Sequence, residues 1–355
     1  MLENYLNYHI ALSRAIDFEK LAQEAELGKS PRHIMMSISK RLNAKIHAPA
    51  QLNISFADKL FSKISSRPEH WALARKIAKE TNENDVIFCT GEDIGIPVAV
   101  MCAKNRNRPK VVVYFHNIDR PRGKLSLKLF GAAHKIDLFM ACTSYQTNFL
   151  ADYLNLPESK IFLRLDQTDT NFFKPGPVST DKKRPTLVSV GLEKRDYRLL
   201  AAATADLDLD VKISGFSTDA NAIKKTFPAV MPANMSRKFY EWSDLLQLYR
   251  DADIVVVSLV DNKYAAGVQV MMEAMACKRP VIISNTKGMV DYLKRSEAIK
   301  VVQVGDTESL RQAIIALLNN PKTAQSQAQA GYEVIQSQHS SEVYEEAFIK
   351  RLTSI

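Results

Sequence analysis

Apolar and polar positions alternate along this chain with two different periods. Short runs rich in β-branched and aromatic residues are separated by longer segments whose apolar residues recur with helical spacing. This alternation is typical of parallel sheets whose two faces are covered by helices. In the first half the predicted strands are 9–13, 44–47, 85–89, 111–116, 138–143 and 161–165, and the clearest helices are 32–43 and 68–81.

The same pattern resumes after a stretch of linker composition. Residues 166–184 carry prolines, a glycine and several hydroxyl residues between periodic segments. Beyond them we predict strands at 186–190, 211–214, 254–258 and 280–284, helices at 196–206, 242–251, 268–277 and 307–319, and, after a break at 336–340, a last helix at 341–352. The fold class is therefore α/β with two doubly wound, Rossmann-like domains, 1–175 and 184–337, and a C-terminal helix, 338–355, that packs back on the first.

Length and composition agree with two domains and exclude several classes of protein. The 355 residues, 46% of them hydrophobic, can fill two cores of ordinary size. Four cysteines stand without metal-ligand spacing, which indicates a reducing compartment and no structural zinc. The N-terminus lacks the apolar core of a secretory signal, and no apolar run reaches the roughly 20 residues of a spanning helix. We expect a cytoplasmic protein, either soluble or peripheral on the cytoplasmic face of a membrane.

The net charge of +9 favours an anionic partner, and its distribution is uneven. Residues 101–136 hold nine Lys or Arg against one acid, Asp119. Within them Leu125, Leu127 and Leu129 interleave with cations, as on a helix that rests on anionic lipid headgroups. An ordinary sheet-covering helix with a solvated basic face explains the pattern equally well. We expect no nucleic-acid partner.

The strand at 254–258, the loop at 259–267 and the helix that starts near Val268 form a candidate anion site. A helix N-terminus offers free N–H groups and a positive dipole end, which can hold a diphosphate without a metal. Gly267 lets the backbone approach an anion closely, and Glu273, about two turns into the helix, can accept hydrogen bonds from two ribose hydroxyls. The alternative is a solvated Glu273 and a Gly267 that only caps the helix.

The segment from Glu273 to Ile282, EAMACKRPVI, resembles the nucleotide-sugar motif of glycosyltransferase family 4, whose members have the two-domain GT-B fold. Ala265 stands where that motif has its first glutamate, and Lys278 where it has a glycine. Related branches instead carry an Ala-Gly pair, which Ala266 and Gly267 match. The resemblance implies a nucleoside diphosphate sugar as donor, with a UDP-sugar favoured, and no other cofactor and no metal.

Residues 187–200, LVSVGLEKRDYRLL, are similar to the family's glycine turn, basic residue and helix. The resemblance makes Gly191 the turn glycine and Arg195 the residue that pairs the donor phosphates, since a guanidinium offers a bidentate fork to phosphate oxygens. Lys194 is a weaker, second candidate for pairing the donor phosphates. In the alternative reading, Arg195 and Asp196 pair locally at the start of the helix.

Residues 242–258 resemble the family's helix and strand that precede the donor loop. In relatives the strand just before them, here 236–242, lies near the nucleotide base. This points to Tyr240, Glu241 and Trp242 as a base-side region. Arg32, near the start of a helix in the first domain, is a further candidate for reaching the donor phosphates across an interdomain cleft.

On the acceptor side, the resemblance places a histidine at the end of an N-domain strand close to the reacting sugar. His116 ends the strongest predicted strand of that domain, where open α/β sheets bind ligands. It can orient a sugar or move a proton, or simply cap the strand. Glu92 and Asp93 follow another strand of the same sheet and either contact an acceptor hydroxyl, serve as base if the reaction inverts, or cap a helix.

The function implied is metal-independent transfer of a glycosyl group from a nucleoside diphosphate sugar to a hydroxyl of a lipid, glycan or small molecule, with retention of configuration. A nucleotide-sugar epimerase on the same fold and a non-catalytic GT-B binding subunit are the alternatives. Asp206, Asp208 and Asp210 imitate a metal-binding DxD motif, but they lie between a predicted helix and strand and are interpreted as a solvated loop.

Overall fold

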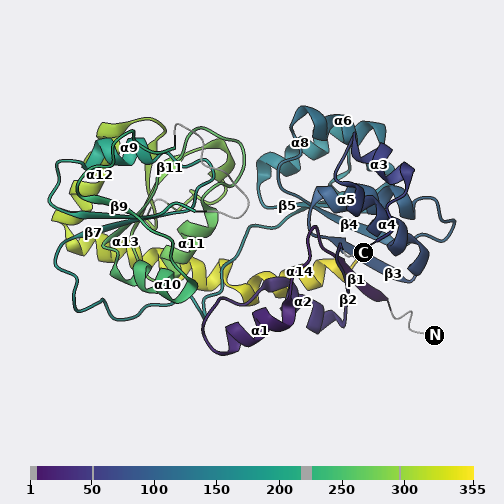
Figure 1. The fold of residues 1–355 in the computed structure, drawn as a ribbon, viewed down its shortest axis with the longest axis horizontal. Helices are drawn as coiled ribbons and strands as arrows, with labels where there is room; N and C mark the ends of the chain where they lie inside the picture. The colour runs from purple at the N-terminus through teal and green to yellow at the C-terminus, as the bar shows by residue number, and fades with distance from the viewer. Residues whose placement is uncertain (1–5, 50–51, 217–225, 296) are drawn as a thin grey trace. The chain divides into compact units, whose positions relative to one another are not determined.

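The computed structural model describes residues 6–49, 52–216, 226–295 and 297–355. The chain divides into two compact units (Figure 1). Unit 1 comprises Met1–Lys20, His33–Arg164 and Glu345–Ile355, and unit 2 comprises Leu21–Arg32 and Leu165–Tyr344. Each is built on a six-stranded sheet whose described pairings are all parallel. The predicted fold class, α/β with two doubly wound sheets, is confirmed.

The sheet of unit 1 has the strand order β2-β1-β3-β4-β5-β6. Its strands are β1 (Asn7–Ala11), β2 (Lys45–His47), β3 (Asp85–Cys89), β4 (Lys110–Phe115), β5 (Leu138–Ala141) and β6 (Ile161–Leu163). The helices between these strands are α1 (Phe18–Glu26), α2 (Ile34–Leu42), α3 (Phe56–Ser62), α4 (Pro68–Glu80), α5 (Glu92–Cys102), α6 (Pro121–Leu129), α7 (Ala132–Lys135) and α8 (Ser144–Leu154), followed by the short 3-10 turn η1 (Glu158–Lys160). From Leu21 on, α1 belongs to unit 2. The central strands β3 and β5 are buried at every position because helices cover both faces.

Unit 2 has the strand order β12-β11-β10-β7-β8-β9. Its strands are β7 (Thr186–Val190), β8 (Asp210–Ser214), β9 (Met235–Arg237), β10 (Ile254–Val257), β11 (Val281–Asn285) and β12 (Lys300–Gln303). Its helices are α9 (Tyr197–Thr204), α10 (Trp242–Asp251), α11 (Val268–Ala276), α12 (Thr307–Asn319) and α13 (Pro321–Val334), with the 3-10 turn η2 (Lys287–Met289) and the π-helical stretch η3 (Ile335–His339). The last helix, α14 (Ser341–Leu352), belongs to unit 1 from Glu345 on.

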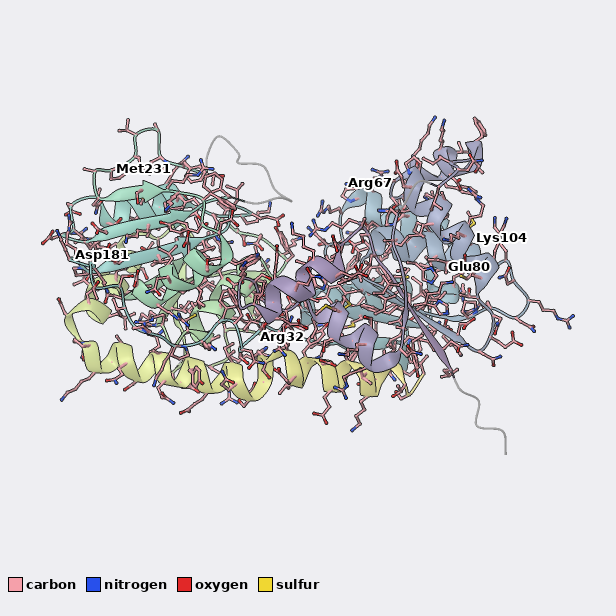
Figure 2. All side chains as sticks on the ribbon, turned by 60° about the horizontal axis from the view of Figure 1, so that its bottom comes forward. Arg32, Arg67, Glu80, Lys104, Asp181 and Met231 are labelled. Atoms are coloured by element: carbon pink, nitrogen blue, oxygen red, sulfur yellow. The ribbon has the colours of Figure 1, made fainter. Side chains whose placement is uncertain are left out.

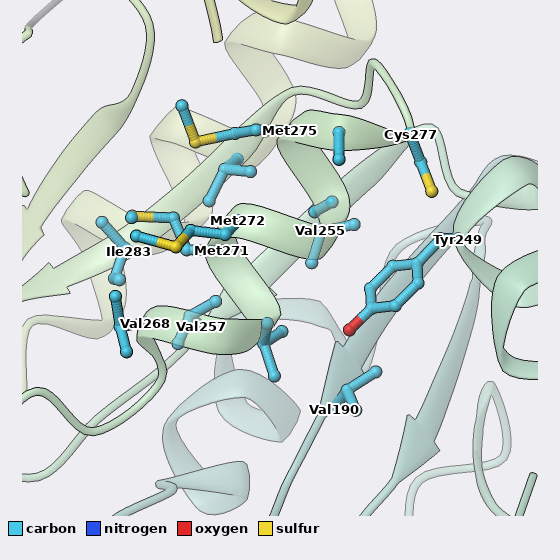
Figure 3. Close-up of a cluster of buried hydrophobic side chains, with 14 of the residues drawn as sticks. Val190, Tyr249, Val255, Val257, Val268, Met271, Met272, Met275, Cys277 and Ile283 are labelled. Carbon is cyan, nitrogen blue, oxygen red and sulfur yellow. The ribbon is translucent and has the colours of Figure 1, made fainter. Parts of the chain in front are cut away.

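Alternate residues of the unit 2 strands enter two separate cores. Val255 and Val257 of β10 face a core that includes α10 and α11, whereas Ile254 and Val256 face a core that includes α9 and α12. Successive side chains of a strand point to opposite faces, so a run of four apolar residues is what a doubly covered strand requires. Figure 3 shows the first of these cores, with Met271, Met272 and Met275 of α11 over the sheet.

Three sequence expectations needed correction. The expected break at 336–340 is wrong, because the helical turns continue through η3 and only Ser340 is extended; that stretch contains no Gly or Pro to stop a helix. The strand β9 ends at Arg237 rather than continuing to 242. The strand β12 was not predicted, since it has only four residues, with an exposed Lys or Gln at each end.

Candidate functional site

The strand order of unit 2 creates a switch point between β7 and β10. The chain leaves β7 toward β8 on one side and leaves β10 toward β11 on the other. In open α/β sheets, ligands bind at the carboxyl ends of the strands at such a point. The two loops that follow these strands are joined by backbone hydrogen bonds, from Val260 N–H to Lys194 O (2.9 Å) and from Asp196 N–H to Ser258 O (3.0 Å). The two segments singled out from the sequence therefore form one surface.

Arg195 lies buried in this surface, with 4% of it exposed. Its Nε donates to Val190 O and its Nη1 donates to Glu193 O, both at 2.9 Å. Burial lowers the pKa of the guanidinium, and within the described part of the chain no carboxylate forms an ion pair with it. A buried cation without a counter-charge attracts an anionic ligand.

The predicted local pair between Arg195 and Asp196 does not form. The Asp196 carboxylate instead accepts a hydrogen bond from Leu199 N–H (3.0 Å) and caps the N-terminus of α9. Lys194, the weaker phosphate candidate, is exposed and has a left-handed backbone (φ 56°). Of the two basic residues considered for the phosphates, Arg195 is buried and Lys194 is exposed.

Two glycines make room for the Arg195 guanidinium. A Cβ on Gly191 (φ 91°) would lie 2.6 Å from Nη2, and a Cβ on Gly267 (φ 89°) would lie 3.4 Å from Nη1 and 2.6 Å from Val257 Cγ1. Both backbone angles also favour glycine. Any other residue at either position would displace the arginine or strain its loop.

Gly267 is the N-cap of α11 and supplies no side-chain acceptor to the first turn. Val268, the first helical residue, and Ala266 are both buried, so the turn is held firmly. The carbonyl of Tyr264 accepts from Ala266 N–H (2.7 Å), and Gly288 of η2 packs against the Tyr264 backbone so closely that a Cβ would fall 2.0 Å from that oxygen. The resulting terminus presents backbone N–H groups and the positive end of the helix dipole.

Glu273 lies on the same helix and is only 8% exposed. The interpretation as a solvated helix residue is therefore wrong. Tyr249 of α10, whose ring points toward α11 in Figure 3, donates to Glu273 Oε2 at 2.6 Å. Burial raises the pKa of Glu273 to about 7, against the opposing effects of the Tyr249 hydrogen bond and the Arg195 charge. Ionisation of this buried carboxyl group is therefore unfavourable, and the carboxylate can accept hydrogen bonds from hydroxyl donors.

The base-side candidates Tyr240, Glu241 and Trp242 lie between the end of β9 and the start of α10. Trp242 is partly exposed and meets Phe172 and Phe173 edge-on, and Lys238 Nζ lies 5.2 Å from the centre of the Tyr240 ring. Glu241 is the N-cap of α10 without a side-chain hydrogen bond to that helix.

Sequence reasoning missed Arg237 at this edge. Its guanidinium lies 4.4 Å from the ring centre of Phe216 and 4.2 Å from that of Phe227, and it donates to Gly215 O. Phe216 and Phe239 are themselves exposed and contact each other. The sequence signal for this edge is weak: Phe216 and Phe239 each stand two residues after the end of a short strand.

Arg32, a candidate for binding the donor phosphates, is instead bound to two carboxylates, those of Asp169 and Glu342. Its guanidinium donates to Asp169 Oδ1 (2.6 Å) and Glu342 Oε1 (2.7 Å), and its backbone N–H donates to Asp169 Oδ2 (2.8 Å). These two carboxylates raise the pKa of Arg32. Figure 2 shows Arg32 beside the C-terminal helical segment. The side chain is already neutralised within unit 2.

Unit 1 has its own switch point, between β1 and β3. Ser13, after β1, donates from Oγ to Asp93 Oδ1 at 2.6 Å, and Asp93 stands in the first turn of α5 after β3. Behind them lies the buried His70, whose Nε2 is 2.7 Å from Ser13 O and whose Nδ1 is 2.5 Å from Ser66 Oγ. Asp93 remains partly exposed and is the carboxylate that a ligand at this edge can meet.

His116 and Glu92 are joined to each other. Both Glu92 oxygens accept backbone N–H groups, from His116 (2.9 Å) and from Asn117 (3.2 Å). The exposed His116 ring has its Nε2 3.0 Å from Thr90 O. Glu92 therefore holds the loop after β4 in place, and the strand-capping hydrogen bond considered for His116 is present.

The three aspartates that imitate a DxD motif are ion-paired. Asp206 binds Arg311 at 2.6 Å, while Asp208 and Asp210 lie 3.0 and 3.7 Å from Arg184. Their charges are compensated by arginines of the same unit. Among the residues that the structure describes, His, Cys, Asp and Glu side chains form no group of three or more that could hold a metal ion.

The class of protein follows from comparison with known families. Residues 180–334 match the family model described as glycosyl transferases group 1, so this part of unit 2 is a glycosyl transferases group 1 domain. The chain as a whole has the GT-B fold and is a glycosyltransferase. No curated protein sequence is detectably similar to it.

Solved structures resemble the chain over its full length. A glycosyltransferase from Rickettsia africae has 13% identity and a TM-score of 0.70, with 98% of each chain covered. Anabaena HepE in complex with UDP-glucose has 12% identity and a TM-score of 0.70, covering 98% of this chain and 100% of HepE. The UDP-forming α,α-trehalose-phosphate synthase of Burkholderia vietnamiensis has 12% identity, a TM-score of 0.73 and complete coverage of both chains. At these identities the likeness establishes the fold.

Proposed function

We propose that this glycosyltransferase transfers a hexosyl group from a UDP-sugar to a hydroxyl group of a lipid, glycan or small-molecule acceptor. The observation that carries the proposal is the arrangement at the β7/β10 switch point, where a buried, uncompensated Arg195, the uncapped N-terminus of α11 and the buried Glu273 occur together. The choice of uridine is supported by HepE, solved with UDP-glucose, and by the UDP-forming trehalose-phosphate synthase.

Each of these groups has a role that its chemistry suits. Arg195 Nη2 and the N–H groups of the first α11 turn bind the diphosphate and stabilise the charge that develops on it as the sugar leaves. Glu273 accepts hydrogen bonds from the ribose hydroxyls, with Tyr249 fixing its orientation. Because the cation and the helix terminus already supply positive charge, the reaction proceeds without a metal.

On unit 1, Asp93 is the side chain that meets the acceptor hydroxyl, held by Ser13. His116 orients the sugar from the neighbouring loop, which Glu92 fixes. Retention of configuration follows the reaction course expected for the family, with Asp93 positioning the hydroxyl rather than forming a covalent intermediate. Ala265, at the position of the motif's first glutamate, leaves the sugar end of the site without a carboxylate there.

A thermal-shift panel of UDP, GDP, ADP and TDP tests the donor assignment, because a ligand selective for the folded state raises its stability by about 2.7 kcal/mol at a hundredfold excess over Kd. UDP is expected to give the largest shift. Arg195→Ala and Glu273→Gln should abolish it, whereas Lys194→Ala, a neighbouring exposed cation, should keep it. No shift with any nucleotide would refute the donor site.

Product analysis with UDP-glucose tests the reaction itself. A transferase releases UDP and a glycoside or free glucose, with undiminished rate in EDTA, and NMR of the glycoside gives the anomeric configuration. An altered sugar still attached to UDP would identify an epimerase. A UDP-induced shift with no turnover for any acceptor class would identify a non-catalytic binding subunit.

A further inference from the structure

Unit 1 exposes four large apolar side chains on two helices. Phe56 and Leu60 of α3 are 83% and 50% exposed. Leu125 and Leu129 of α6 are 52% and 59% exposed. Each pair is four residues apart and so shares one face of its helix. Water contact of this extent is unfavourable for large apolar groups, and exposed apolar clusters mark interaction sites.

The helices α3 and α6 are neighbours, as Figure 1 also shows. Arg122, in the first turn of α6, donates from Nη2 to Ser62 O at 2.7 Å and from Nε to Ile64 O at 3.1 Å, at the end of α3. Their inward sides share a core in which Phe61 meets Phe130 edge-on. The four exposed side chains are not part of this core. Together with the exposed cations of the segments 56–67 and 119–130, we call them the α3–α6 surface.

The two segments that carry these apolar side chains are rich in exposed cations. The exposed basic residues of segments 56–67 and 119–130 are Lys59, Lys63, Arg67, Arg120, Arg122 and Lys128. The two acids in these segments are Asp58, which is buried and bound to Arg75, and Asp119, which accepts a hydrogen bond from Tyr145. The α3–α6 surface thus combines large apolar groups with a strongly positive charge.

We propose that the α3–α6 surface docks on an anionic lipid bilayer. Its apolar side chains enter the boundary between headgroups and acyl chains while its cations bind lipid phosphates. Cations alone would suit an acidic protein equally well, but four large exposed apolar groups on the same two helical segments match a bilayer interface, which offers both kinds of partner. No helix in the described part of the chain is long and apolar enough to cross a membrane.

The position of this surface in unit 1 links it to the acceptor side. The helix α6 starts at Pro121, in the loop that begins with His116 at the carboxyl end of β4. A lipid acceptor in the same bilayer would be presented near that edge of the sheet. This last step rests on the proposed function, whereas the docking itself does not.

Sedimentation with vesicles of phosphatidylcholine alone, or mixed with phosphatidylglycerol, tests the docking. The full chain should bind only the mixed vesicles and lose binding at high salt. Phe56→Ser combined with Leu125→Ser should weaken binding at least about tenfold. Lys59→Gln combined with Lys128→Gln should weaken it by roughly fivefold for each cation removed.

The controls come from unit 2. Val230→Ser removes a side chain that is 82% exposed, and Lys322→Gln removes an exposed cation; neither should change binding. Absence of sedimentation with mixed vesicles at low salt would overturn the proposal. So would unchanged binding of the Phe56/Leu125 variant, which would reduce the contact to general electrostatics. The UDP-induced thermal shift, measured on the same variants, should persist, so a failure of docking is distinct from a failure of the donor site.

Discussion

Glu273→Gln offers a direct test of the donor site, because ionisation of the buried carboxyl group is unfavourable in the folded protein. Burial raises its pKa from 4.5 to about 7. At about 1.36 kcal/mol for each pH unit between these values, the ionised carboxylate costs about 3 kcal/mol of folding free energy. The pKa of Glu273 is higher in the folded state than in the unfolded state, so the protonated carboxyl group favours folding. This contribution to stability is fully present below pH 4.5 and is lost as the pH rises to about 7.

Glutamine keeps the shape and the acceptor for Tyr249 but cannot ionise. Relative to the wild type, the variant should therefore gain stability progressively across this pH range, up to about 3 kcal/mol above pH 7. Its uncompensated amide N–H adds a constant offset of about 1–3 kcal/mol, so the slope with pH is the quantity to measure. Glu193→Gln, an exposed acid of the adjacent loop, should leave the slope unchanged.

Urea unfolding at a series of pH values measures this slope. The chain has two tryptophans, and in a Trp71→Phe background the remaining Trp242 reports on unit 2. Calorimetry with UDP completes the test: wild-type affinity should fall as the pH drops below about 7, because hydroxyl donors select the ionised carboxylate. Equal pH slopes for wild type and Glu273→Gln would refute the burial argument, and equal UDP affinity would refute the ribose contact.

Three further outcomes follow from the geometry. Gly191→Ala should abolish the UDP-induced thermal shift, because its Cβ would meet Arg195 Nη2, whereas Gly305→Ala, also at positive φ but with open space around it, should keep the shift. Asp93→Asn should lower the transfer rate at least about tenfold with the UDP shift intact, since it touches the acceptor side alone. Lys278→Gly should stabilise the protein by about 1 kcal/mol in urea unfolding, because Lys278 has a left-handed backbone (φ 56°) at the end of α11.

The sequence predicted most strands of both sheets because their positions are buried on two faces and read as continuous apolar runs. Gly267 and Glu273 could be found because one strand, loop and helix presents them within a short segment, and Arg195 because it lies in a second such segment, between β7 and α9. Tyr249 could not, since its hydrogen bond depends on how α10 packs on α11. Arg32 was misplaced for the same reason: its partner Asp169 is 137 residues away in the chain.

The donor site also shows which of its parts could be re-engineered. Arg195 is oriented by two carbonyls of its own loop, Val190 O and Glu193 O, rather than by side chains. Substitution of neighbouring side chains leaves that orientation in place, so the diphosphate end can tolerate a varied library around it. At the exposed aromatic edge, Phe216 and Phe239 contact each other, and the described neighbour that a backbone carbonyl holds there is Arg237, through Gly215 O. Altered nucleobase preference should therefore be sought at that edge, with Gly191 and Gly267 kept fixed.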